Sequence, residues 1–148
     1  MEQLDCPSLE IWEQRRQWFE RCLDEVQHPF ANYIVSDHAT ALLVELQACY
    51  CVGAGVSVII LSISIIDAQL RETEAGDGRI GTAKLLNEYY GGDEINWLRK
   101  LRNKYVHIDI DSPALKVDDQ YLKRKELETD ATKAIKMVIR SFFQSPGV

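Results

Sequence analysis

ACYCVGAGVSVIILSISII, residues 48–66, is the stretch that decides the fold, because these 19 consecutive residues carry no charged side chain. A helix of this length is long enough to cross a lipid bilayer. Three serines and two glycines dilute its hydrophobicity, however, and a buried helix of a globular protein is the alternative. The alternation within VSVIILSISII would also suit a strand, but the surrounding sequence has helical spacing. We therefore expect a core helix.

This predicted helix has two different sides, which favours close packing on a neighbour. One stripe is large and apolar, and the other is small: Val56, Ile59, Ile60, Ile63, Ile66 and Leu70 form the first, and Ser57, Ser64 and Ala68 form the second.

Apolar spacing and helix-end signals predict further helices on both sides of this stretch. The expected ranges are 8–27, from Ser36 or Asp37 to about 50, 54–73, 82–90, from the cap Asp93 to about 107, and 119–143. The break near GAG is weak, so the second and third helices could form one kinked element. The fold class that follows is all-α, an antiparallel bundle of four to five helices in one domain over residues 1–148.

The first and last of these helices have clear inward faces. In the first, the expected inward residues are Ile11, Trp12, Trp18, Phe19, Cys22, Leu23 and Val26. In the last, they are Leu122, Leu127, Ala131, Ala134, Ile135, Val138, Phe142 and Phe143, with Lys133, Lys136 and Arg140 outward.

Charge and cysteine content limit the possible functions. A net charge of −6 argues against sequence-blind adhesion to nucleic acid, so any such contact must be a local basic patch. The N-terminus lacks the pattern of a secretory signal, and a cytoplasmic location is expected.

The four cysteines could form a zinc site, but their spacing favours buried, reduced thiols: Cys6, Cys22, Cys49 and Cys51.

A basic cluster lies in DEINWLRKLRNKYVHIDIDSP, residues 93–113. Sorted by helical angle, its core-facing stripe contains Trp97, Leu98, Leu101, Tyr105 and Ile108. The opposite face contains Asn96, Arg99, Lys100, Arg102, Asn103 and His107, with Ile95 and Val106 among them. Asn103 and His107 are four residues apart and therefore neighbours on that face.

Histidine and arginine on one face suit phosphodiester chemistry. Histidine exchanges a proton near neutral pH, and arginine offers planar, permanently charged donors to phosphate oxygens. Cleavage of RNA without a metal needs a base, an acid and a cation beside the phosphorus. His107 fills only one proton role at a time, so a two-fold dimer would supply the second.

Two other interpretations of this stretch remain open. The basic residues could form a solvated helix face, with His107 only ending the helix near the negative end of its dipole. Alternatively, His107, Asp109 and Asp111 in HIDID could bind a metal ion, because alternate residues of an extended segment share a side.

RNKYVH, residues 102–107, resembles the defining motif of the HEPN superfamily, in which an arginine and a polar residue precede a histidine. The order of elements is also similar, with a long apolar helix before the motif helix, and the resemblance covers residues 30–143. It leaves residues 1–29 as an N-terminal helical extension. The resemblance implies an all-α, metal-independent endoribonuclease without a cofactor that acts as a homodimer, with its site at the two-fold interface.

The resemblance also implies roles for individual residues. Arg102 would hold the scissile phosphate, His107 would transfer the proton, and Asn103 would orient the substrate. Asp67, with Glu72 behind it, is the acidic residue expected to face the motif. The neighbouring basic residues Arg99, Lys100 and Lys104 are expected to bind the RNA substrate.

Members of this superfamily are often toxins or abortive-infection effectors of phage defence, paired with a nucleotidyltransferase antitoxin. Others serve as non-catalytic regulatory bundles that bind a partner protein or a nucleotide, and this is the second function to consider. Because acidic residues repel RNA, Asp109 and Asp111 are expected to point away or to be neutralised, for example by Lys123, Arg124 or Lys125.

Overall fold

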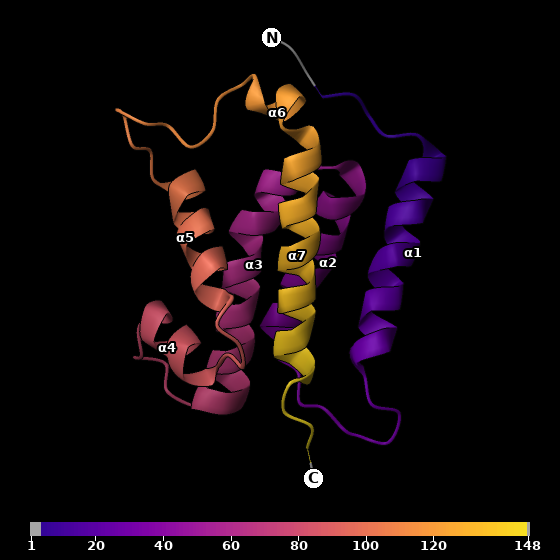
Figure 1. Ribbon diagram of the computed structural model, residues 1–148. Coiled ribbons are helices and arrows are strands. Elements are labelled where there is room, and N and C mark those ends of the chain that lie inside the picture. Colours follow the sequence, from indigo (N-terminus) through magenta and orange to yellow (C-terminus); the bar gives the residue numbers. More distant parts are fainter. Residues whose placement is uncertain (1–3, 148) are drawn as a thin grey trace.

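The computed structural model describes residues 4–147, and this part of the chain is all-α (Figure 1). Its elements in chain order are α1 (Leu9–Val26), α2 (Asp37–Val52), α3 (Gly55–Leu70), the π-helical turn η1 (Arg71–Ala75), α4 (Thr82–Tyr89), α5 (Ile95–Val106), α6 (Asp119–Leu122) and α7 (Arg124–Phe143). The only β-type pairing among these residues is an isolated bridge between Asn32 and Gly147. The predicted fold class is therefore confirmed at the level of an all-α bundle.

The uncharged stretch folds as the end of α2 and most of α3, separated by a tight turn. Gly53 ends α2 with a φ of 88°, and its amide donates to the carbonyls of Cys49 and Tyr50. An L-residue rarely adopts this conformation, so glycine is the natural residue here. Among residues 4–147, no helix combines the length and hydrophobicity that crossing a bilayer requires.

Helix α3 is the centre of the bundle. It packs against α2, α4, α5 and α7, and in Figure 1 it lies between α5 and α2, behind α7. The predicted apolar stripe is buried at Ile59, Ile63, Ile66 and Leu70, whereas Ile60 is 36% exposed. Because α3 has neighbours on several sides, Val58, Ser62 and Ile65 are buried as well.

Helix α3 approaches α7 closely at Gly55. A Cβ atom added to Gly55 would lie 3.1 Å from the backbone oxygen of Leu127. The inward face of α7 is confirmed at Leu127, Ala131, Ala134, Ile135, Val138 and Phe142, and Met137 and Ile139 are also buried. Leu122 was expected to point inward but is 84% exposed, because it lies in α6, before the chain turns at Lys123.

Helix α1 contributes to the same hydrophobic core through Phe19 and Cys22. It packs on α2 and α7, and Ser8 caps its first turn by accepting a hydrogen bond from the amide of Ile11. Ile11 and Val26 were expected to point inward, but both are exposed. Only one side of α1 faces the bundle, so the predicted apolar face was too wide.

Two other helix ends differ from the prediction. Helix α5 begins after Glu94 without a side-chain cap, so Asp93 is not the capping residue. Helix α3 ends at Leu70, and the chain continues as η1. The amide of Gly76, which has a φ of 61°, donates to the Arg71 carbonyl and ends this turn.

Candidate functional site

Helix α5 carries the RNKYVH motif, and its buried face is rotated from the predicted one. Leu98 is fully buried as predicted, but Ile95, which was placed on the outer face, is also buried. Ile108 was expected in the core and is 76% exposed, because α5 has already ended at Val106. Helix α5 packs against both α3 and α4, so more than one of its sides is covered.

The rotation places Arg102 at the edge of the buried face, because it follows Ile95 and Leu98 at helical spacing. Arg102 is half-buried, and its Nε atom is buried without a hydrogen-bond partner among the described residues. A buried donor without a partner is costly and uncommon. Arg102 therefore has donor capacity that the fold itself does not use.

Asp67 lies in the last turn of α3 and faces Thr82 at the start of α4. Its carboxylate accepts hydrogen bonds from Arg71 at 3.0 and 2.8 Å and from the Thr82 hydroxyl at 2.8 Å. Burial raises the pKa of Asp67, but the hydrogen bonds from Arg71 and Thr82 and the charges of Arg71 and Arg102 outweigh it. The net pKa lies below the ordinary value, so Asp67 is a carboxylate at neutral pH.

The charge of Arg102 is the smallest of the causes that lower the Asp67 pKa, and among the described residues no ion pair joins these two side chains. Arg71 and Thr82 were not predicted as site residues. Arg71 could have been found from the sequence, because it lies four residues after Asp67 on a helix. Thr82 is 15 residues away, and only the fold brings it to Asp67.

His107 occupies a different position from Arg102. It is the exposed C-cap of α5, and its amide donates to the Asn103 carbonyl at 2.9 Å. Its side chain lines an open cavity of about 260 Å³ with Lys104, Asp109, Ser112, Pro113 and Ala114. Arg102 is not among the residues that line this cavity.

The remaining predicted residues form an accessible basic surface on α5. Lys100 and Lys104 are exposed, whereas Arg99 and Asn103 are half-buried. The ion pairs found within residues 4–147 do not include Arg99, Lys100 or Lys104. These side chains are therefore available to an external anion.

The acidic segment after the motif forms a turn. The Asp109 carboxylate accepts hydrogen bonds from the amides of Asp111 and Ser112. Two of the residues expected to neutralise this segment bind elsewhere: Lys123 pairs with Asp119, and Arg124 donates to Gln120 and to the Gly53 carbonyl. The negative charge beside His107 is thus not offset by these two residues.

Neither metal hypothesis gains support from the geometry. Within the described range 4–147, no three His, Cys, Asp or Glu side chains lie close enough to hold a metal ion. Cys22 and Cys51 are buried, Cys49 is half-buried and Cys6 is exposed, all as free thiols. Burial raises the pKa of the Cys22, Cys49 and Cys51 thiols, which keeps them protonated.

Comparisons of this chain with protein-family models, with curated proteins and with solved structures found no match. The resemblance to the HEPN superfamily therefore depends on the motif, the order of the helices and the position of Asp67.

Proposed function

We propose that this protein is a metal-independent endoribonuclease of the HEPN type that acts as a homodimer. The observation that carries the proposal is the position of Arg102. Its Nε donor is buried and has no hydrogen-bond partner among the described residues, and its charge contributes to the lowered pKa of Asp67. A guanidinium with unused donors is suited to a phosphate oxygen.

The proposed reaction is an internal transfer within RNA. His107 removes the proton from a ribose 2′-hydroxyl, and the 2′-oxygen attacks the adjacent phosphorus. Arg102 stabilises the negative charge that develops on the phosphate oxygens, and Asn103 orients the phosphate. The bond from phosphorus to the 5′-oxygen breaks, and an acid protonates the leaving oxygen. The products are a 2′,3′-cyclic phosphate and a 5′-hydroxyl.

His107 of a second copy would act as that acid, which is why the proposal includes a homodimer. His107 is exposed at an open cavity, as contact with a second copy requires. Lys100 and Lys104, together with Arg99, would hold neighbouring phosphates of the RNA. An enzyme of this kind would act in the cytoplasm as the toxin of a toxin–antitoxin or phage-defence system, restrained by a nucleotidyltransferase-type antitoxin.

The test is cleavage of RNA by the purified protein in the presence of EDTA. We expect products with cyclic-phosphate ends, and Arg102→Ala should lower the rate about 10²- to 10³-fold because it removes a charge-stabilising donor. Arg79→Ala removes an exposed arginine from the segment before α4 and should have no effect. Cleavage that needs a metal ion, or an Arg102→Ala variant as fast as the wild type, would contradict the proposal.

A second candidate function is a non-catalytic bundle that binds a partner protein. The observation that favours it is the set of large apolar side chains exposed between the motif and α7: Ile108, Ile110, Val117 and Leu122, with exposed fractions of 76, 85, 71 and 84%. In Figure 1 the segment between α5 and α6 extends away from the bundle. Exposed apolar residues that lie together often mark an interaction surface.

The two functions predict different results for RNA cleavage by the wild type and for partner binding by the Ile110→Ser variant. If this segment serves only binding, Ile110→Ser should abolish complex formation with the partner, and the wild-type protein should cleave no class of RNA. RNA cleavage that depends on Arg102 would exclude a purely non-catalytic function.

A further inference from the structure

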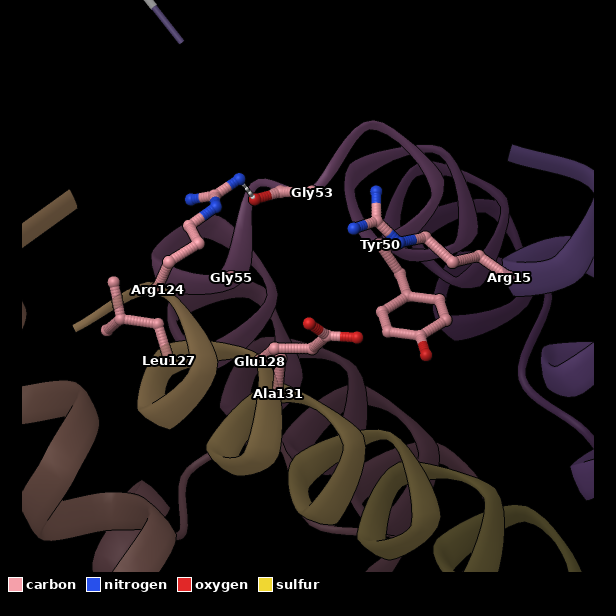
Figure 2. A pocket seen from close by; sticks show the side chains of 8 residues that line it. All are labelled: Arg15, Tyr50, Gly53, Gly55, Arg124, Leu127, Glu128 and Ala131. Atoms are coloured by element: carbon pink, nitrogen blue, oxygen red, sulfur yellow. Dashed lines mark hydrogen bonds between the residues drawn. The ribbon is translucent and has the colours of Figure 1, made fainter. Parts of the chain in front are cut away.

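Two arginines converge at the turn between α2 and α3. A Cβ atom added to Gly53 would lie 2.7 Å from Nη2 of Arg124 and 3.2 Å from Nη1 of Arg15. Figure 2 shows the two guanidinium groups on either side of Gly53, one from α7 and one from α1. Two positive charges therefore reach the same point, although α1 and α7 are far apart in the sequence.

Neither arginine is neutralised by an acidic side chain. Arg15 donates to the Cys51 carbonyl at 3.1 Å, and Arg124 donates to the Gly53 carbonyl and to the Gln120 side chain. The ion pairs within residues 4–147 include neither of them. A guanidinium has five N–H donors, so each arginine keeps donors that the fold does not use.

A small cavity opens beside these two groups. It is lined by Arg15, Tyr50, Gly53, Gly55, Arg124, Leu127, Glu128 and Ala131, and its free volume is about 20 Å³. This space holds about one water molecule, so a larger group would lie at the open mouth of the cavity and not inside it. Helix α3 begins at Gly55 without a side-chain cap, so the positive end of its dipole lies at the same cavity.

Tyr50 contributes its ring to the lining of this cavity. The residue is 94% buried, and Figure 2 shows its hydroxyl at the end of the ring that points away from the two guanidinium groups. Burial, together with the nearby Glu128 carboxylate, raises the pKa of Tyr50 to about 12. The hydroxyl therefore stays protonated at neutral pH and adds no negative charge to the site.

We propose that Arg15 and Arg124 form a binding site for a single phosphate group at the α2–α3 turn. Planar guanidinium groups match the geometry of phosphate oxygens, and a helix N-terminus adds to the attraction. Glu128 is the one acidic residue in the lining, and it weakens the site by repulsion. The site consists of residues from α1, α2, α3 and α7 and does not include the motif on α5, so it does not depend on the proposed ribonuclease activity.

Isothermal titration with inorganic phosphate tests the site, with potassium chloride added to keep the ionic strength constant. The wild-type protein should bind phosphate with one-to-one stoichiometry, and Arg15→Gln should weaken the affinity at least about tenfold. Arg16→Gln is the matched control, because Arg16 is adjacent on α1 but pairs with Glu13 and Glu20. It should leave the affinity unchanged.

A second variant makes the test independent of any folding defect in Arg15→Gln. Glu128 is exposed, and Glu128→Gln removes the only negative charge of the lining. We expect this variant to bind phosphate more tightly than the wild type. If the arginines serve only to cap α2, neither the wild type nor Glu128→Gln binds phosphate above the chloride control, and the proposal is wrong.

The source of the phosphate group is distinguished by two short oligonucleotides that differ only in a 5′-phosphate. Tighter, Arg15-dependent binding of the phosphorylated one identifies a terminal or free phosphate. Equal, Arg15-dependent binding of both identifies an internal phosphodiester. Binding of phosphate and of both oligonucleotides that is unchanged in Arg15→Gln would overturn the proposal.

Discussion

At the scale of single residues, Asp67 links the stability of the fold to the position of Arg102. The carboxylate is bound by Arg71 and Thr82, and Arg71 also donates to the Ile80 carbonyl at 2.6 Å. Asp67 therefore connects α3 to the chain segment that leads into α4, against which α5 packs. Its loss should affect both stability and the environment of Arg102.

Asp67→Asn should lower the free energy of unfolding at pH 7 by about 1–3 kcal/mol, because Arg71 loses its charged partner. Burial alone would raise the pKa of Asp67, but Arg71 and Thr82 bring it below the ordinary value of 3.8. A lowered pKa in the folded state means that the stabilisation is present above about pH 4 and is lost as the pH falls through that lowered pKa. Urea unfolding of both proteins from pH 7 to pH 3 measures this.

The difference in the free energy of unfolding between the wild type and Asp67→Asn should shrink toward low pH. Asp24→Asn, which changes an exposed carboxylate on α1, serves as the control and should match the wild type. A difference between wild type and Asp67→Asn that stays constant down to pH 3 would show that the hydrogen-bonded carboxylate is not its cause.

The residues of α5 show why the sequence predicted the motif better than its surroundings. Angular sorting identified Leu98 as buried and Lys100 as exposed, because these follow from helix period and side-chain type. It placed Ile95 and Arg102 on the exposed face. The spacing of apolar residues in α5 does not reveal that two helices, α3 and α4, pack against it. The aliphatic stem of arginine also tolerates the edge of a core.

At the scale of elements, the turn at Gly53 is a tightly packed junction of the bundle. It ends α2, begins α3 and receives Arg15 and Arg124. Its position was foreseeable from the glycines in the sequence, whereas the two arginines that meet there come from segments that only the fold brings together. The division of the last helix at Lys123 was not foreseeable, because no glycine or proline marks it.

Gly53→Ala should destabilise the protein by more than Gly76→Ala, which is its matched control. Both positions have a positive φ, which costs about 1–2 kcal/mol for an L-residue. A Cβ at Gly76 would meet no atom within 4 Å, whereas one at Gly53 would displace the Arg124 guanidinium. Thermal or urea unfolding measures both variants, and equal losses would show that the arginine contact contributes nothing.

At the scale of the whole molecule, one hydrophobic core includes residues from α1, α2, α3, α4, α5 and α7. Phe19 and Cys22 of α1 belong to it, so the segment expected as an N-terminal extension is packed with the rest. Assembly is the level that a single copy describes least, because His107 of one copy fills only one of the two proton-transfer roles of the proposed reaction.

A site that uses His107 of both copies predicts that one altered copy inactivates a dimer. His107→Ala should be nearly inactive alone, and wild type refolded with an equal amount of His107→Ala forms mixed dimers that keep only one of the two histidines. With random pairing, about a quarter of the dimers contain two wild-type copies, so about a quarter of the wild-type activity should remain. Analytical ultracentrifugation confirms that dimers form. About half of the wild-type activity, as expected if each copy acts alone, would contradict a shared site.

The most direct test of the central claim, that His107 performs proton transfer in metal-independent RNA cleavage, is the cleavage rate of one RNA in EDTA. A positioned acid or base contributes about 10²- to 10⁴-fold, so His107→Ala should be slower than the wild type by that factor. His38→Ala changes an exposed histidine on α2 and should retain the wild-type rate. Equal rates for His107→Ala and the wild type, or no cleavage by the wild type, would contradict the account.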